Sequence, residues 1–454
     1  MKNRIVALLA ALTLAVTLLL SGAVSATAAG YPLPADVTIN AQSAILVSLA
    51  GNPASDMVLY EKDADEVRAP GAMMRYMVLA YALHRIEEKG LDIDEDTGSY
   101  TIALFNEFVA GTGVPTANMA YGETWTLRDL LTVSFIHNAS DAVVVLAEAV
   151  DGDVHTFIDG MNTLAMEIGC VNSHFYHLSG LDSLSQYTTA RDMYRIVRYC
   201  QSFSLFEDLV GVADVKVTPV KGGSTRTITT NNHLMMTTST HYYSPLVHSR
   251  TGLSDNDGRT CAAVARDSGY EYLVVVMGCP EKDADGQTGT HYRDAKALFK
   301  WAFKQFEYKT ILAKNEILAS ITVEEVWDTD RLNLVPAKEI ATVVDKNMTA
   351  DQIIRKVTVY DKTATAPIEK GDVYGKVELF VNVDQKIGEV DLVASQTLER
   401  SDLMHTWNQI VNTLGTALPI ILIAVGVLAV LIVAYVIFAI NHNRRRRNNY
   451  KLRK

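Results

Sequence analysis

The stretch Pro70-Gly71-Ala72-Met73-Met74-Arg75-Tyr76-Met77 leads into an apolar run that ends near Ile86. This pattern predicts a helix that begins just after the proline-bearing loop and places residues i and i+3 on one face. Ala72 and Arg75 are therefore expected to be neighbours at the N-terminal end of that helix. Alanine offers no nucleophile, and a guanidinium stays protonated near pH 7, so the pair supplies neither a nucleophile nor a base.

Strand-like segments stand on both sides of a long, mainly helical block. Two runs at 44–49 and 57–60, separated by a Gly-Asn-Pro turn, precede the block as a hairpin. Strand patterns return from residue 215 onwards, and a last helix is predicted at 292–306. This order predicts an α+β domain over residues 31–307, with a sheet that joins the first strands to the last ones.

Residues 308–400 have a different pattern. Short alternating or β-branched runs, including 321–323 and 340–344, predict a small all-β domain, a β-sandwich. Residues 401–413 then place apolar side chains at helical spacing. They fit either an amphipathic collar on the outer membrane surface or the first turns of the helix that follows.

The two ends of the chain have the patterns of a targeting segment and an anchor. Residues 1–28 combine a basic start, an apolar run and an Ala-Thr-Ala cleavage pattern, which indicates a secretory signal peptide. Residues 414–440 carry no charge and would extend roughly 40 Å as a helix, enough to cross a bilayer with tilt. The arginine-rich tail, 441–454, is then cytoplasmic and the rest of the mature chain extracellular.

The part of the chain between these ends is acidic. Leaving out the nine basic residues of the two ends, 32 Lys and Arg stand against 52 Asp and Glu, a formal net charge of −20. Nucleic acid is therefore not an expected partner. Four cysteines either form two disulfides or stay free and buried: Cys170, Cys200, Cys261 and Cys279. Without a Cys-x-x-Cys pair, neither a metal nor a cofactor is predicted.

Several stretches elsewhere have recognisable motifs. Residues 175–182 read Phe-Tyr-His-Leu-Ser-Gly-Leu-Asp, residues 186–193 read Gln-Tyr-Thr-Thr-Ala-Arg-Asp-Met, and residues 368–375 read Ile-Glu-Lys-Gly-Asp-Val-Tyr-Gly. Together they resemble the D-alanyl-D-alanine carboxypeptidases of peptidase family S11, the low-molecular-weight penicillin-binding proteins. The resemblance covers about residues 40–396 and implies a penicillin-binding-protein/β-lactamase-like serine transpeptidase fold.

The resemblance also implies three catalytic motifs, and this chain departs from each. Ala72 and Arg75 occupy the serine and lysine positions of Ser-x-x-Lys, and residues 68–80 contain no Ser, Thr or Cys. Asn138-Ala139-Ser140 stands in place of Ser-x-Asn, with the hydroxyl and the amide exchanged. Arg250-Thr251-Gly252 stands in place of Lys-Thr-Gly and keeps the charge and the hydroxyl, which suit a bidentate contact with a carboxylate.

Loss of the nucleophile costs such an enzyme several orders of magnitude in rate. We therefore predict a catalytically silent, membrane-anchored homologue of these carboxypeptidases, in a Gram-positive envelope. Its cleft would bind a peptidoglycan stem peptide or a cell-wall-synthesis partner through Arg250, Thr251 and Gly252. Two alternatives stay open: an active D-Ala-D-Ala carboxypeptidase that trims the stem pentapeptide, and a vestigial cleft in a protein that acts through its β domain and anchor.

Other candidates are weaker. Ser140 beside Asp141 would need His137 as a base to serve as a replacement nucleophile, and His174 and His177 are spaced like ligands but lie in the 175–182 region. If Arg75 faces Arg250, the two like charges would need an anion or Asp141 between them.

Overall fold

The computed structural model describes residues 31–349, 352–381 and 385–451. These residues divide into two units, which are described separately. The first unit ends at Glu307 and includes the later segment Val343–Asn347, and the second contains Tyr308–Thr342 and the chain from Met348 onwards. The signal-peptide prediction for residues 1–28 lies outside the described residues.

A five-stranded antiparallel sheet, in the order β2-β1-β9-β8-β7, forms the centre of the first unit. Its strands are β1 (Ser43–Ser48), β2 (Met57–Lys62), β7 (Leu246–Ser254), β8 (Gly258–Asp267) and β9 (Tyr270–Cys279). β1 pairs with both β2 and β9, so the sheet joins the first strands of the domain to its last ones, as predicted. All six residues of β1 are buried, because elements pack on both faces of the sheet.

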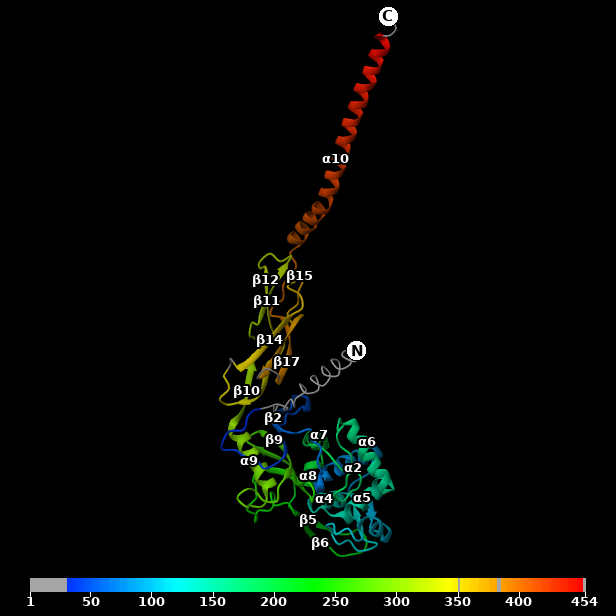
Figure 1. Ribbon diagram of the computed structural model, residues 1–454, viewed down its shortest axis with the longest axis vertical. Coiled ribbons are helices and arrows are strands. Elements are labelled where there is room, and N and C mark those ends of the chain that lie inside the picture. The colour runs from blue at the N-terminus through cyan, green and yellow to red at the C-terminus, as the bar shows by residue number, and fades with distance from the viewer. Residues whose placement is uncertain (1–30, 350–351, 382–384, 452–454) are drawn as a thin grey trace, which may run out of the picture. The chain divides into compact units, whose positions relative to one another are not determined.

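Helices lie on both sides of this sheet (Figure 1). α9 (Thr290–Gln305) packs on β8 and β9, and α7 (Ala190–Cys200) packs on the same sheet from the other side, with α2 (Arg75–Lys89) next to it. The remaining helices of this unit are α3 (Ile102–Leu104), α4 (Leu127–Ile136), α5 (Ser140–Asp151), α6 (Val154–Glu167) and α8 (Phe206–Val210). The short helical turns are η1 (Pro53–Ser55), η2 (Gly71–Met74) and η3 (Phe105–Val109).

The helix predicted after Pro70 forms in two steps. Gly71–Met74 makes a single 3₁₀ turn, η2, and the α-helix α2 then continues to Lys89. Ten of the fifteen residues of α2 are buried, so it is a central helix rather than a surface one. Gly90 ends it with φ +65°, a left-handed conformation that glycine adopts without strain.

Two small hairpins complete the first unit. They are β3 (Thr97–Ser99) with β4 (Thr124–Thr126), and β5 (Asp214–Val217) with β6 (Arg226–Thr229). The first strand patterns after residue 215 thus form a separate two-stranded sheet and are not part of the central one. All four cysteines are free and buried, so the free-thiol alternative holds.

The second unit contains the predicted all-β domain. Its strands form a six-stranded sheet in the order β14-β16-β17-β12-β11-β15. They are β11 (Ala319–Glu324), β12 (Arg331–Pro336), β14 (Ile353–Val359), β15 (Thr363–Thr365), β16 (Val373–Val381) and β17 (Gln385–Ala394). The segment predicted at 340–344 is β13 (Ile340–Asp345), which pairs with β10 (Phe306–Leu312) in a sheet of two strands and not with the other six.

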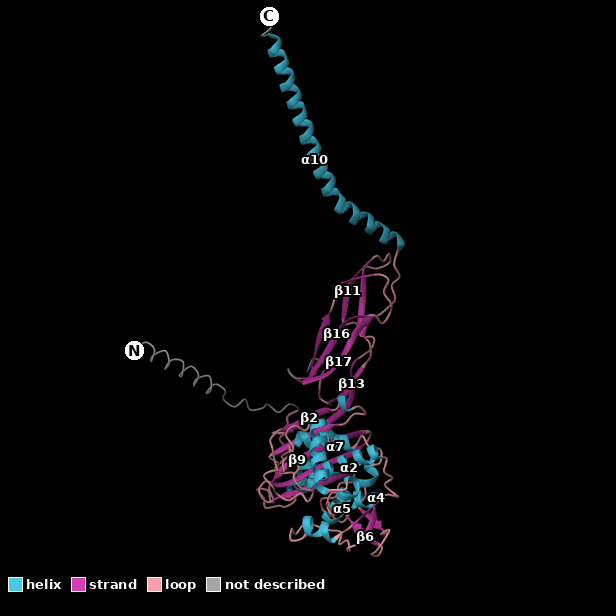
Figure 2. Ribbon diagram, turned by 90° about the vertical axis from the view of Figure 1, so that its right-hand side faces the viewer, coloured by secondary structure: helices cyan, strands magenta, loops and turns pink. Residues whose placement is uncertain are grey.

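One helix, α10 (Asp402–Lys451), follows the β domain. Within the described part of the chain it alone is long and apolar enough to cross a membrane, over Asp402–His442. The residues predicted as a collar and as a span lie on this one continuous helix. Figure 2 shows it bent, and Pro419 in its interior supplies a cause, because proline removes a backbone hydrogen bond.

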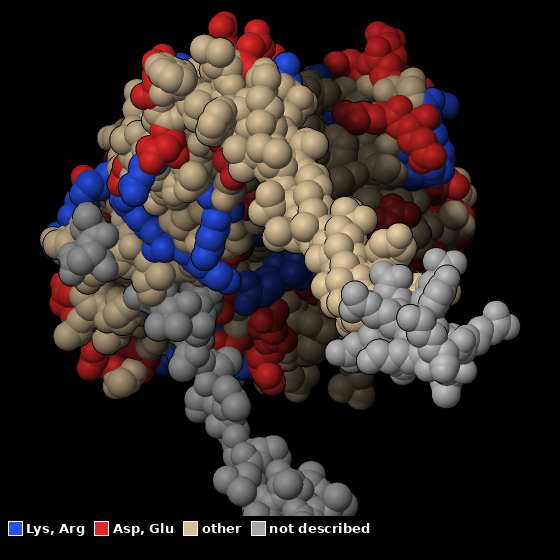
Figure 3. Space-filling view, turned by 90° about the horizontal axis from the view of Figure 1, so that it is seen from above, with Lys and Arg blue, Asp and Glu red and all other residues tan. Residues whose placement is uncertain are grey.

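On the face in Figure 3, acidic and basic side chains lie close together.

Candidate ligand-binding cleft

A cleft of about 580 Å³ opens in the first unit beside β7 and the start of α2. Five of the seven predicted site residues line it, namely Ala72, Asn138, Arg250, Thr251 and Gly252. The other two, Arg75 and Ser140, are buried, and they hydrogen-bond to each other. The fold therefore brings together all three segments that the sequence singled out.

Ala72 lies at a narrow part of the cleft, where other backbone segments approach it closely. A Cβ added to Gly180 would lie 2.8 Å from the Cα of Ala72, and one added to Gly252 would lie 2.8 Å from its backbone nitrogen. Only glycine permits these approaches. The methyl group of Ala72 thus stands at the position of the expected nucleophile and has no atom that can be acylated.

Arg75 fixes the segments around Ala72 in place. Its Nε donates to Asn138 Oδ1 (3.0 Å), its Nη2 to Ser140 Oγ (3.2 Å) and its Nη1 to the carbonyl of Leu178. Burial, together with the charge of Arg250, lowers the pKa of Arg75 to about 9, which still leaves it protonated at pH 7. This side chain is therefore a structural donor and not a base.

The segment 138–140 is held by local geometry. Asn138 has φ +60°, a left-handed conformation that asparagine tolerates better than most residues, and Ser140 then begins α5. The carboxylate of Asp141 accepts from the backbone amides of Ala117 and Met119, at 2.8 and 3.0 Å. The oxygens of Asp141 thus bind backbone amides and neither arginine, although its charge opposes the lowering of the Arg75 pKa.

Arg250 lines the cleft from β7, but most of its donors already have partners. Its Nη1 donates to the carbonyls of Phe135 and Ile136, its Nη2 to Asn231 Oδ1 (2.7 Å), and its Nε to the carbonyl of Thr251 (3.2 Å). A guanidinium has five N–H groups, so one remains for a ligand. Burial lowers the pKa of Arg250 to about 10, and none of the described carboxylates forms an ion pair with it.

The structure also shows the contacts of the three histidines considered as weaker candidates. His137 points its Nδ1 at the carbonyl of Thr229 (2.8 Å), so no contact makes it a base for Ser140. His174 Nδ1 contacts the carbonyl of Ser185 (2.6 Å), whereas His177 Nδ1 lies 3.2 Å from Ser179 Oγ at the cleft.

A second group of residues lies along the cleft without a motif that marks it in the sequence. Arg259 on β8 lies opposite Leu253 in the register of the β7–β8 hairpin, and His291 lies in the first turn of α9. Tyr292 also lines the cleft, and its ring is tilted against that of His241, with ring centroids 5.1 Å apart. The sequence offered one indication that Arg259 lies near the cleft: it comes just after the turn that follows Arg250-Thr251-Gly252.

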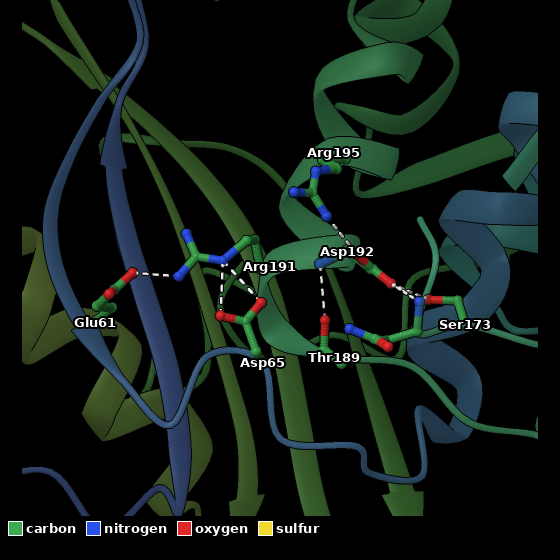
Figure 4. A network of polar contacts seen from close by, with 8 residues as sticks. Glu61, Asp65, Ser173, Thr189, Arg191, Asp192 and Arg195 are labelled. Atoms are coloured by element: carbon green, nitrogen blue, oxygen red, sulfur yellow. Dashed lines mark hydrogen bonds and ion pairs between the residues drawn. The ribbon is translucent and has the colours of Figure 1, made fainter. Parts of the chain in front are cut away.

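The motif at 186–193 has a structural role, because none of its residues lines the cleft. Figure 4 shows Arg191 between Glu61 and Asp65, while Thr189 Oγ1 accepts from the amide of Asp192 and caps α7. The buried carboxylate of Asp192 also accepts from Ser173 Oγ (2.9 Å). The motif therefore ties α7 to the strand and loop before Pro70.

Comparison with known proteins tests the resemblance directly. A family model described as D-alanyl-D-alanine carboxypeptidase matches residues 26–281, which is more than half of the chain.

The chain belongs to the D-alanyl-D-alanine carboxypeptidase family.

The carboxypeptidase homology extends through the β domain, because a model for the C-terminal domain of penicillin-binding protein 5 matches residues 306–400. D-alanyl-D-alanine carboxypeptidase DacF of Bacillus subtilis is 22% identical over 364 residues, covering 80% of this chain and 86% of that protein. DacC of Escherichia coli is 25% identical over 367 residues, covering 80% and 85%. Penicillin-binding protein 5 of Haemophilus influenzae has the same fold, with a TM-score of 0.60 at 21% identity, covering 82% of this chain and 100% of that one.

Proposed function

We propose that this member of the D-alanyl-D-alanine carboxypeptidase family is catalytically silent, and that its cleft binds the D-Ala-D-Ala end of a peptidoglycan stem peptide or a cell-wall-synthesis partner. The observation that carries the proposal is the pair at the start of α2. Ala72 supplies no nucleophile, and each nitrogen of the Arg75 guanidinium already donates a hydrogen bond. Acyl transfer by this pair has neither of its two chemical groups.

Ligand binding is supported by the residues Arg250, Thr251 and Gly252 that line the cleft. Gly252 lets the turn that carries Ala72 approach β7 closely. Arg250 adds a buried positive charge and one N–H. Buried charges without a counterion cost free energy, so a cleft with no remaining use would gain stability by losing them. An anionic ligand would offset that cost.

A second candidate function is hydrolysis by a relocated nucleophile. Ser179 lines the cleft, and its Oγ lies 3.2 Å from His177 Nδ1. Two observations oppose it. His177 Nε2 is buried without a partner in the described chain, so no carboxylate orients the ring. Burial, with the charge of Arg75 adding to it, lowers the pKa of His177 and weakens it as a base.

We also propose that α10 crosses the cytoplasmic membrane of a Gram-positive bacterium. The basic tail after His442 would lie inside, and the first unit and the β domain outside. Residues 401–413 would then form the amphipathic collar on the outer surface, where the exposed side chains of Leu403 and Trp407 contact lipid.

The test is calorimetric titration of the detergent-solubilised full chain with an N-acylated peptide ending in Lys-D-Ala-D-Ala, with released D-alanine assayed in parallel. We expect saturable binding and no D-alanine. Released D-alanine that disappears in Ser179→Ala would establish the second candidate. A chain that neither binds the peptide nor releases D-alanine would contradict stem-peptide recognition by the cleft.

A further inference from the structure

The two arginines that line the cleft differ in what they already bind. The donors of Arg250 are engaged by three carbonyls and by Asn231 Oδ1. The side chain of Arg259 forms no hydrogen bond and no ion pair with any described residue. A half-buried guanidinium that keeps all five N–H groups available can grip a planar anion with two parallel hydrogen bonds.

A second unpartnered group lines the same cleft. His291 is 3% exposed, and its Nδ1 has no hydrogen-bond partner among the described residues. Buried polar atoms are nearly always paired, so this nitrogen, on a residue that lines the cleft, is free to bond a ligand atom or a water. His291 also lies in the first turn of a sixteen-residue helix, whose N-terminus favours negative charge.

The fold holds these groups in place. Gly258, at φ +84°, packs so closely on the carbonyl of Cys279 that a Cβ there would lie 2.5 Å from that oxygen. This contact fixes the hairpin end from which Arg259 extends. Glu281 is the only carboxylate among the described residues that line the cleft, and it is exposed and forms no ion pair with Arg259.

We propose that Arg259, together with Thr251 and His291, forms an anion subsite that receives the C-terminal carboxylate of the ligand. This inference rests on the proposed function, and it assigns the principal carboxylate contact to Arg259 and an organising role to Arg250. Arg250 stabilises the backbone of α4 and β7, and Arg259 discriminates a ligand with a free carboxylate from one without.

The test compares two peptides on three forms of the full chain in detergent. The peptides end in D-Ala-D-Ala with either a free carboxylate or a carboxamide. The forms are the unmodified chain, Arg259→Gln and a matched control, Arg266→Gln. Arg266 lies on the same strand, and its partners are Glu207 and Glu271. Both substitutions remove one positive charge.

We expect the unmodified chain and Arg266→Gln to prefer the carboxylate peptide. Arg259→Gln should bind it on the order of 10- to 100-fold more weakly, with no preference over the carboxamide. Equal affinity of Arg259→Gln and the unmodified chain for the carboxylate peptide would overturn the assignment.

A small-anion arm separates this inference from the proposed function. If no peptide binds, the proposed function fails, and thermal unfolding with acetate or phosphate tests the subsite alone. A rise in Tm with acetate that Arg259→Gln abolishes would still support it. No rise with acetate, or a rise with phosphate only, would overturn the carboxylate assignment.

Discussion

Arg75 lies one turn after Ala72 and joins separate segments of the cleft. Its guanidinium joins the 138–140 segment to the loop at Leu178 through three hydrogen bonds, from a fully buried position. A lysine there has a shorter reach and cannot present the same planar set of donors. Arg75 thus holds the walls of the cleft together.

This role predicts a stability effect. Arg75→Met would leave Asn138 Oδ1 and the Leu178 carbonyl without their donor, and we expect a loss of about 2–4 kcal/mol in the free energy of unfolding. Urea denaturation monitored by circular dichroism measures it. Arg128→Met is the control, because Arg128 forms an exposed ion pair with Asp94 that is worth less than about 1 kcal/mol. Equal losses in the two variants would contradict the role assigned to Arg75.

His248 predicts a pH dependence. It is fully buried beside Tyr76 Oη, and burial lowers its pKa from 6.5 to about 3. The unfolded chain takes up a proton near pH 6.5 that the folded chain refuses, so this residue makes stability fall as pH decreases from 6.5 towards 3.

We expect His248→Phe to reduce the slope of unfolding free energy against pH by about 1.4 kcal/mol per pH unit in that window. Urea unfolding at pH 7, 6, 5 and 4 gives both slopes. Parallel slopes for the variant and the unmodified chain would show that His248 is not held neutral.

Among the elements, α7 owes its start to the motif at 186–193. Thr189 caps the helix, and Asp192 satisfies donors of the neighbouring loop from a buried position. We expect Thr189→Val to cost about 0.5–2 kcal/mol of unfolding free energy and to leave peptide affinity unchanged, since Thr189 lies outside the cleft lining. Denaturation and calorimetry on one sample give both values. A variant of unchanged stability that loses affinity would give the motif a binding role instead.

The sequence predicts elements well where a pattern is local. The apolar run after Pro70 predicts α2, and apolar strands at both ends predict the central sheet. The strand predicted at 340–344 forms as β13, but an alternating run does not name its partner, and Ile340–Asp345 pairs with β10 outside the six-stranded sheet.

The site was predictable where a motif marks it. The segments at Ala72, Asn138 and Arg250 were found because the family pattern names those positions. Arg259 and His291 were missed because hairpin register and the start of α9 bring them to the cleft, and single residues carry no periodic signal. The partners of Arg250 were likewise invisible, since they are backbone carbonyls of α4.

For the whole molecule, α10 is the feature that sets location. A chain that ends at Arg400 lacks this helix and its uncharged run. We expect the full chain to stay with membranes after an alkaline carbonate wash, and the truncated chain to be released. Sedimentation followed by immunoblotting distinguishes the two. A truncated chain that stays with the membrane would mean that another surface anchors it.

The central claim is that the cleft cannot form an acyl-enzyme, and intact-protein mass after incubation with penicillin tests it most directly. The full chain in detergent would be measured beside the double variant Ala72→Ser, Arg75→Lys. We predict no mass increase on the unmodified chain, because Ala72 has no hydroxyl and Arg75 cannot act as a base. An adduct on the double variant alone would show that the rest of the cleft still receives an acyl-peptide analogue. A covalent penicilloyl adduct on the unmodified chain would contradict the account.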